Sequence, residues 1–184
     1  MRIIGGDARG KQLFLPKGCP IRPTADLVKG ALFSVLRSVS EVSFLDLFAG
    51  SGSVGIEALS RGAAKAVFVE RNRSLAHAIA DNLSRCGFDA RSEILAADVK
   101  SAIRILSERQ VSFDIVFADP PYDTGFIDLT LQYLAVSSVI SREGLLVLQH
   151  SVREKLPEKA DKRFILTDQR RYGDTVLSFL KITD

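Results

Sequence analysis

The sequence has few residues that could cross-link the chain, hold a metal ion or enter a membrane. Its two cysteines, Cys19 and Cys86, are 67 positions apart and form no CxxC pair. This spacing excludes a disulfide framework or an ordinary zinc site and favours a reduced, cytoplasmic protein. The two histidines have no second ligand at metal spacing, so no metal site is predicted. The apolar runs are far shorter than the ~20 residues of a membrane span. The first six residues lack the apolar stretch of a signal peptide.

What the sequence does contain is ordinary globular composition with an uneven distribution of charge. Of 184 residues, 46% are hydrophobic and 26% charged, which suits a chain with one full core. The net charge is only +3, but residues 1–24 hold five basic residues and one acidic residue. A basic segment on a nearly neutral body is typical of a polyanion-binding protein, although a solvated tail is the alternative. We predict a basic arm or small hairpin over residues 1–23 and one domain over 24–184.

Apolar runs and amphipathic stretches alternate from residue 42 onward. Strands are predicted over 42–48, 66–69, 94–95, 113–118 and 145–148, with helices over 53–61, 74–86, 99–106 and 126–136. This alternation predicts a parallel, doubly wound sheet. The last apolar runs, 164–166 and 175–180, flank residues 169–174 without an intervening helix, which predicts an antiparallel hairpin.

A glycine-rich turn follows the first predicted strand. Gly50, Ser51 and Gly52 open a G-x-G-x-x-G pattern that ends at Gly55, directly before a helix. Glu70 lies at the end of the next strand, where an acid can accept hydrogen bonds from both ribose hydroxyls of a nucleotide. Taken alone, the pattern suits a dinucleotide as well as S-adenosylmethionine, and glycines that only turn the chain are a further interpretation.

Other acids favour S-adenosylmethionine over a dinucleotide. Asp46 lies inside the first strand, where a carboxylate could hold the ammonium group of the methionine end, which a nicotinamide dinucleotide lacks. Asp98, after the third strand, could accept from the adenine amino group or cap its helix. Arg71 and Val99, the residues after Glu70 and Asp98, complete the predicted donor site. The chain is also too short for the separate substrate domain of many dehydrogenases.

The residues after the fourth strand suit an amine acceptor. Asp119, Pro120, Pro121 and Tyr122 form a DPPY turn at the carboxyl end of that strand, where open α/β sheets bind ligands. The Asp119 carboxylate and the Pro120 carbonyl can each accept one N–H of an exocyclic amine, and the prolines fix this backbone in advance. Tyr122 offers a flat face for a base taken out of its stack. A Pro-Pro turn with a surface tyrosine is the simpler interpretation of these four residues.

With these motifs in place, the chain resembles the small-subunit (16S) rRNA guanine-N2 methyltransferases of the RsmD type, which modify guanine 966. The resemblance is carried by RIIGG at 2–6, RPT at 22–24, LDLFAGSG at 45–52, EALSRGA at 57–63, FVE at 68–70, DPPY at 119–122 and YGDT at 172–175. It implies a class I methyltransferase fold, which is Rossmann-like with a mostly parallel seven-stranded sheet and a C-terminal antiparallel hairpin. It also implies S-adenosylmethionine as donor.

The resemblance implies a partner as well: small-subunit rRNA, either naked or in the assembled small ribosomal subunit. We expect the enzyme to act as a monomer. In the basic arm, Arg9, Lys11 and Arg22 are the residues we expect to contact RNA phosphates. Gln149 stands where we expect an acid in many relatives. The rival interpretations are a DNA adenine-N6 or protein glutamine methyltransferase, and a non-catalytic RNA-binding assembly factor.

Overall fold

The computed structural model describes residues 1–16, 26–122, 125–154, 156 and 163–183. The chain divides into two compact units, residues 1–98 and 99–184. The predicted boundary at residue 23 lies outside the described residues. No helix in the described part of the chain is long and apolar enough to cross a membrane.

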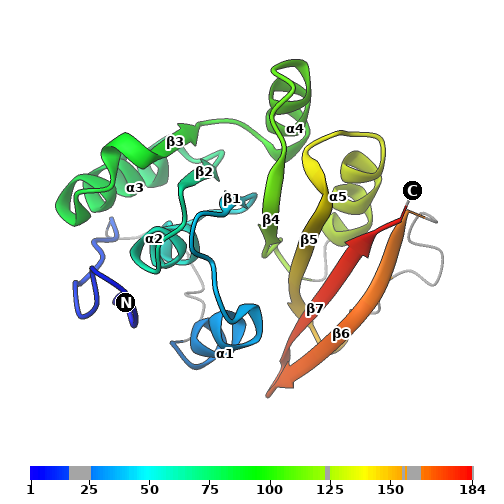
Figure 1. Ribbon diagram of the computed structural model, residues 1–184, viewed down its shortest axis with the longest axis horizontal. Helices are drawn as coiled ribbons and strands as arrows, with labels where there is room; N and C mark the ends of the chain where they lie inside the picture. The colour runs from blue at the N-terminus through cyan, green and yellow to red at the C-terminus, as the bar shows by residue number, and fades with distance from the viewer. Residues whose placement is uncertain (17–25, 123–124, 155, 157–162, 184) are drawn as a thin grey trace. The chain divides into compact units, whose positions relative to one another are not determined.

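The first unit is built on three parallel strands (Figure 1). Its elements are α1 (Asp26–Leu36), β1 (Ser43–Asp46), α2 (Ser53–Ser60), β2 (Lys65–Val69), α3 (Arg73–Cys86), the 3₁₀ turn η1 (Asp89–Arg91) and β3 (Ser92–Leu95). The strand order is β3-β2-β1, with Leu45 opposite Val67 and Phe68 opposite Ile94. The parallel pairing follows from the helical crossover between each strand and the next.

Helix α2 packs tightly on β1 and β2, and all eight of its residues are buried. Gly55 makes this approach possible, because a Cβ atom at this position would lie 2.3 Å from the Phe68 ring. The third glycine of the turn pattern therefore serves helix–strand packing. Helix α3 contacts β3 and ends, as predicted, at Gly87 in the left-handed conformation.

Residues 1–16 lie against α2 and α3, as the blue segment of Figure 1 shows. Ile3 is fully buried, and the Ile4 amide donates to Glu57 Oε2 at 2.9 Å. Glu57 is fully buried and also pairs with the buried Lys29, at 3.5 Å, and with Arg61. Burial lowers the pKa of Lys29, and the Glu57 charge opposes this change. The basic segment is thus joined to the core by a buried ionic network.

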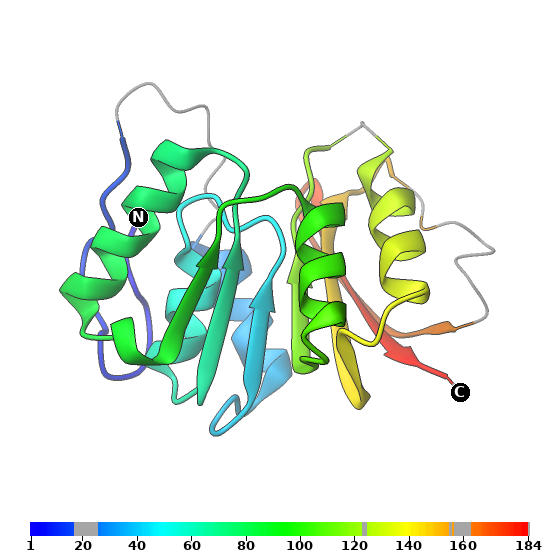
Figure 2. The same cartoon turned by 90° about the horizontal axis from the view of Figure 1, so that it is seen from above.

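The second unit combines one parallel strand pair with an antiparallel hairpin. Its elements are α4 (Val99–Glu108), β4 (Phe113–Ala118), α5 (Phe126–Ala135), β5 (Ile140–Ser151), β6 (Phe164–Tyr172) and β7 (Thr175–Ile182). The strand order is β4-β5-β7-β6. Strands β4 and β5 are parallel, whereas β7 is antiparallel to both β5 and β6. Figure 2 shows α4 and α5 side by side, and they are in contact.

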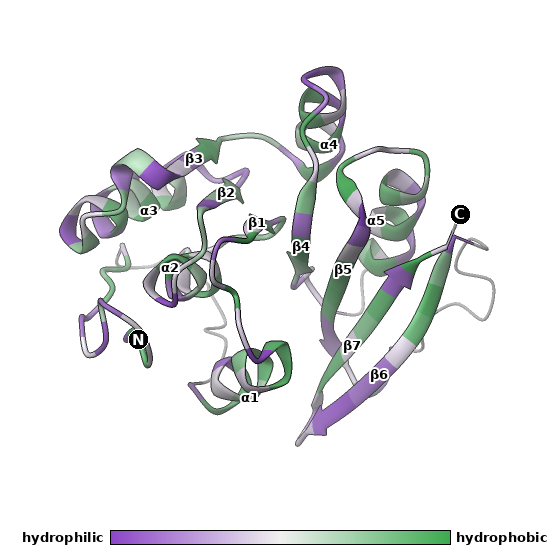
Figure 3. Cartoon of the chain, viewed as in Figure 1, coloured by the Kyte–Doolittle hydropathy of each residue, from purple (hydrophilic) through white to green (hydrophobic). Residues whose placement is uncertain are grey.

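The fold class predicted from the sequence is confirmed: in the part of the chain that the structure describes, seven strands, mostly parallel, alternate with helices and end in a hairpin. Two details of the prediction were wrong. Strand β5 begins at Ile140, ahead of the predicted start at 145. The hairpin turn is limited to Gly173 and Asp174, so Arg170 and Arg171 lie on β6 and not in the turn. Figure 3 shows β6 becoming hydrophilic toward this turn, as suits the edge strand of the unit.

Candidate functional site

The glycine turn between β1 and α2 has the backbone conformation that its sequence predicts. Gly50 has φ 54° and Gly52 has φ 76°, in the left-handed region that favours glycine. Gly52 is also the N-cap of α2, and a Cβ atom there would lie 3.2 Å from side-chain atoms of Ile56 and Ile79. The turn therefore needs glycine at both positions, and it stands directly before the N-terminal end of a helix.

Glu70 is held against this turn by the backbone. The Gly50 amide donates to Glu70 Oε2 at 2.8 Å, and the Asn72 amide donates to Oε1 at 2.8 Å. Each carboxylate oxygen retains a further lone pair, so both can still accept a ribose hydroxyl. Sequence reasoning missed Asn72, whose side chain caps α3 by accepting from the amides of Ser74 and Leu75. An asparagine directly before a helix was the available signal.

Asp46, the last residue of β1, is 1% exposed. Its Oδ2 accepts a hydrogen bond from the Gly55 amide at 3.2 Å, whereas Oδ1 has no hydrogen-bond partner among the described residues. Burial raises the pKa of Asp46 to about 7; the charge of Glu70 adds to this, and the amides of Gly55 and Phe48 oppose it. A buried carboxylate with an unpaired oxygen fits a ligand that brings a positive charge, such as an ammonium group.

The remaining residues of the predicted donor site have different surroundings. Ser51 is buried, and its hydroxyl donates to Met1 Sδ at 3.1 Å, so the first residue of the chain touches the glycine turn. Arg71 is exposed beside Glu70. Asp98 is exposed and is the last residue of the first unit, and Val99 begins α4. The structure thus brings Asp46, Glu70 and the glycine turn together within the first unit and leaves Asp98 and Val99 at the unit boundary.

The DPPY turn lies directly after β4, in the second unit. Asp119 is half-buried, Pro120 is buried, Pro121 is exposed and Tyr122 is half-buried. The two prolines end the strand at Ala118, as predicted. Gln149, on the neighbouring strand β5, donates from Nε2 to Asp119 Oδ2 at 2.8 Å. Its Nε2 also lies 3.5 Å from Tyr122 Oη.

Two of the three predicted RNA-binding residues, Arg9 and Lys11, belong to the described N-terminal segment of the first unit. Arg9 and Lys11 are exposed, whereas Arg22 lies outside the described residues. Lys11 Nζ donates to the Arg85 carbonyl in the last turn of α3, where a cation is favoured by the helix dipole. Asp7 and Ala8 bond Ser60 at the C-terminal end of α2, which is about 12 Å from the glycine turn at its N-terminal end. Arg9 is therefore not a donor-site residue.

Comparison with known proteins identifies the family. Residues 1–181 match the family described as "Conserved hypothetical protein 95". The chain belongs to this family. The protein YlbH of Bacillus subtilis (strain 168), whose name assigns it provisionally to the rRNA methyltransferases, is 31% identical over 182 residues, which cover 98% of both chains. Ribosomal RNA small subunit methyltransferase D of Escherichia coli (strain K12) is 34% identical over 158 residues, covering 85% of this chain and 78% of that protein.

A solved structure supports the same assignment. The protein yhhF of Escherichia coli, titled provisionally as a methyltransferase, has a TM-score of 0.86 and 31% identity. The match covers 99% of this chain and 97% of that chain. The family resemblance predicted from the sequence motifs is therefore confirmed, as is the fold class.

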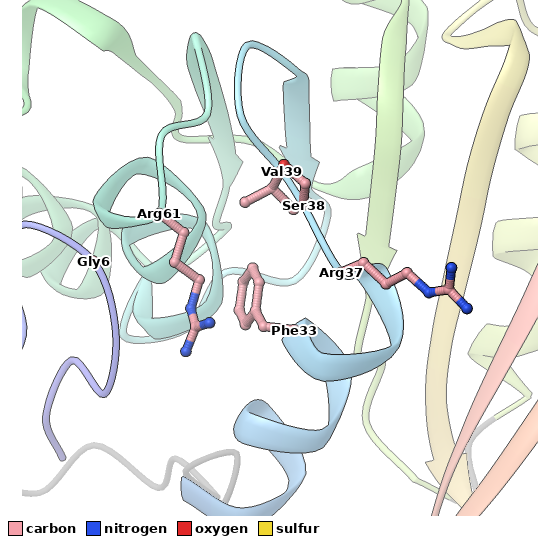
Figure 4. Close-up of a pocket in the computed structure, with 6 residues that line it drawn as sticks. All are labelled: Gly6, Phe33, Arg37, Ser38, Val39 and Arg61. Atoms are coloured by element: carbon pink, nitrogen blue, oxygen red, sulfur yellow. The ribbon is translucent and has the colours of Figure 1, made fainter.

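This member of the Conserved hypothetical protein 95 family also has a pocket that contains none of the predicted site residues. Figure 4 shows the pocket, which has a volume of about 270 Å³ and is lined by Gly6, Phe33, Arg37, Ser38, Val39 and Arg61. The Arg61 guanidinium lies over the Phe33 ring, 4.9 Å from its centroid, and Arg61 Nε donates to Glu57 at 2.8 Å. Arg61 thus belongs to the buried network that joins the N-terminal segment to α2.

The histidines and acids give no sign of a metal centre. No group of three or more His, Cys, Asp and Glu side chains within the described ranges could hold an ion. His150 is buried, with Nδ1 2.9 Å from the Ser151 carbonyl oxygen and Nε2 2.8 Å from Ser178 Oγ. Since a carbonyl only accepts, Nδ1 carries a proton and donates to the Ser151 oxygen. His150 has a structural role.

Proposed function

We propose that this chain is an S-adenosylmethionine-dependent methyltransferase that methylates the exocyclic N2 of a guanine in small-subunit rRNA. The observation that carries the proposal is its similarity, over most of its length, to Escherichia coli ribosomal RNA small subunit methyltransferase D. The unpaired buried oxygen of Asp46 and the amine-binding character of the DPPY turn support it independently.

On the donor side, Glu70 would accept hydrogen bonds from the ribose and Asp46 would hold the ammonium group of the methionine end. Gly50, Ser51 and Gly52 would provide the close backbone approach, with Asp98, Val99 and Arg71 on the adenine and ribose side. The sulfonium of the donor supplies an electrophilic methyl group, so the protein mainly has to bind, orient and exclude water.

On the acceptor side, Asp119 and Pro120 would each accept one N–H of the guanine amine, and Tyr122 would stack on the base. Held in this way, the nitrogen directs its lone pair at the methyl carbon. The N–C bond forms as the S–C bond breaks, and the amine then loses one proton, which the Asp119 carboxylate can accept. Pro121 fixes the backbone of the turn without touching the base.

The partner would be the small-subunit rRNA, presented in the cytoplasm on the assembled subunit to a monomeric enzyme. The basic residues Arg9 and Lys11 support an RNA partner, because exposed cations neutralise phosphates without reading sequence. Arg22 is proposed for the same role from the sequence alone.

A methylation assay with an identified product tests this function. Small subunits, and the naked rRNA extracted from them, are prepared from cells that lack the modification and are incubated with labelled donor. The product nucleosides are then separated. N2-methylguanosine from the parent protein, and none from Asp119→Ala, is the expected result. Label in N6-methyladenosine, in protein only, or in no product would contradict the proposal.

A further inference from the structure

The side chain of Gln149 lies between the two DPPY residues that would handle the base. Ala118 and Leu148 are opposite one another in the parallel β4–β5 pair, so Asp119, directly after β4, comes beside Gln149, the next residue of β5. Gln149 is 4% exposed. Its Nε2 donates to Asp119 Oδ2 at 2.8 Å and lies 3.5 Å from Tyr122 Oη. Strand register thus places one buried amide against both side chains.

The chemistry of the pair fixes how this amide is oriented. An ionised carboxylate only accepts hydrogen bonds, so the Nε2 end of Gln149 has to face Asp119. Its Oε1 is then buried with no partner among the described residues. A buried amide oxygen without a donor lowers stability. Gln149 therefore makes its contact with Asp119 at a cost to the fold, and such costs are typical of functional sites.

We propose that Gln149 is a positioning residue of the acceptor site, which holds the Asp119 carboxylate in the orientation that accepts the amine of the base. The proposal rests on the proposed methyltransferase function and adds a residue to it. The amide donor fixes the direction of Oδ2, and a carboxylate has several acceptor sites, so Asp119 can still accept an N–H of the substrate. Because the amide is uncharged, it orients the carboxylate without competing with it for a proton.

Replacing this donor by an acid gives a distinctive test. In Gln149→Glu, two carboxyl groups would lie within hydrogen-bond distance, and such a pair shares one proton and releases it at raised pH. While the pair holds its shared proton, one carboxyl group still donates a hydrogen bond to the other. When both groups are ionised, the two carboxylates repel each other and Asp119 loses its orientation. The neighbouring His150 is bonded to Ser178 and Ser151, and Tyr122 is a further titratable group beside Gln149.

The measurement is single-turnover methylation of small subunits from pH 6 to 9, at saturating donor, with parent and variant compared at each pH. We expect Gln149→Glu to be within a few-fold of the parent at the acid end and to fall at least about tenfold below it at the alkaline end. A ratio of variant to parent that is constant across this range would overturn the proposal.

Gln149→Met is the matched variant without donor or charge. We expect its rate to fall at least about tenfold at every pH, since misplacing a reacting group is costly. The melting temperature should stay at the parent value, because the variant also removes a buried oxygen that has no partner among the described residues. Donor affinity should stay at the parent value as well. A parent-like rate, or a loss of rate that tracks a loss of stability, would show that Gln149 is only structural.

Failure of the proposed function gives a different result from failure of this inference. If the parent protein methylates another amine, such as adenine N6, the same two variants are measured on that acceptor. If the parent methylates nothing, both proposals fall. If the parent forms N2-methylguanosine and both variants match it, only the role of Gln149 is wrong.

Discussion

Glu70 and Gly50 are 20 residues apart in sequence and are joined by a hydrogen bond of 2.8 Å, in which the Gly50 amide donates to the carboxylate. The acid at the end of β2 is therefore fixed to the glycine turn at the end of β1 by a bond within the protein itself. This preorganisation lowers the cost of ordering the site on binding.

Loss of the Glu70 carboxylate should weaken donor binding. We expect Glu70→Ala to reduce the affinity for S-adenosylmethionine or its demethylated product by about 1–3 kcal/mol, the scale of hydrogen bonds to a charged acceptor. Titration calorimetry measures this change. Asp81→Ala, at an exposed acid of α3, is the control and should bind like the parent. Tighter binding of NAD than of S-adenosylmethionine by the parent would overturn the choice of donor.

Donor affinity should depend on the ionisation of Asp46. With a pKa of about 7, Asp46 is mostly neutral at pH 6 and mostly ionised at pH 8, and only the carboxylate attracts an ammonium group. We therefore expect donor affinity to rise several-fold from pH 6 to 8, up to the roughly tenfold limit that one proton allows per pH unit. Because the donor's own amine also titrates, Asp46→Asn is the control, and its binding should lose the part of the rise that Asp46 causes.

The same shift predicts how Asp46 affects stability. The ordinary pKa of 3.8 applies to the unfolded chain, so between about pH 4 and 7 the folded chain keeps a proton that the unfolded chain has lost. This contribution to the free energy of unfolding is complete below pH 4 and is lost as the pH rises through 7. Denaturant unfolding of the parent should show this fall in the free energy of unfolding as the pH rises from about 4 to 7. A fall of equal size in Asp46→Asn would contradict the prediction.

Removal of the Asp119 carboxylate should affect chemistry and not donor binding. We expect Asp119→Ala to bind donor within a few-fold of the parent and to turn over at least about 100-fold more slowly. Tyr122→Ala should be harmful and Tyr122→Phe mild, because stacking needs the ring and not the hydroxyl. Single-turnover rates decide this, and a near-normal rate in Asp119→Ala would remove this residue from the mechanism.

The basic N-terminal segment should contribute to the salt dependence of RNA binding. For each phosphate that the double variant Arg9→Ala with Lys11→Ala no longer neutralises, the slope of log affinity against log salt should fall by about 0.7 to 0.9. Donor affinity should be unchanged, since both residues lie away from the glycine turn. Arg104→Ala, at an exposed cation on α4, is the matched control. An unchanged slope would show that the segment is only solvated.

Lys11 needs a further control because it also bonds the Arg85 carbonyl. The single variant Lys11→Ala should lower the melting temperature slightly, as expected when a cation is removed from a helix C-terminus. Arg9→Ala should leave it unchanged. Comparison of the two single variants separates RNA binding from helix capping.

The sequence predicted those parts of the fold that local patterns determine. Buried runs such as 113–118 gave strands with the right bounds, and Gly87 correctly ended α3. The start of β5 was missed because Ser141, Arg142 and Glu143 interrupt its apolar pattern, although the strand continues through them. The length of β6 was missed because its polar residues are paired through the backbone, which side-chain polarity does not reveal.

At the candidate site, the glycine turn, Glu70 and the DPPY turn could be found from the sequence because each follows a recognisable strand. Contacts between distant residues could not. Gln149 meets Asp119, 30 positions away, only because of the register of β4 and β5. The count of basic residues in the N-terminal segment did not show that Lys11 would bond Arg85, which is 74 positions away.

The docking of this segment has a consequence for synthesis of the chain. Its partners include Glu57, Ser60, Asn82 and Arg85, which lie 52 to 74 positions further along. Residues 1–16 are therefore among the last of the unit to reach their final place, because α3 has to leave the ribosome before Phe14 and Lys11 can be paired. Until then the apolar side chains of Ile3 and Leu13, which are buried in the folded protein, stay in water. Slowing translation just before residue 85 would prolong this exposed stage and favour aggregation of the nascent chain.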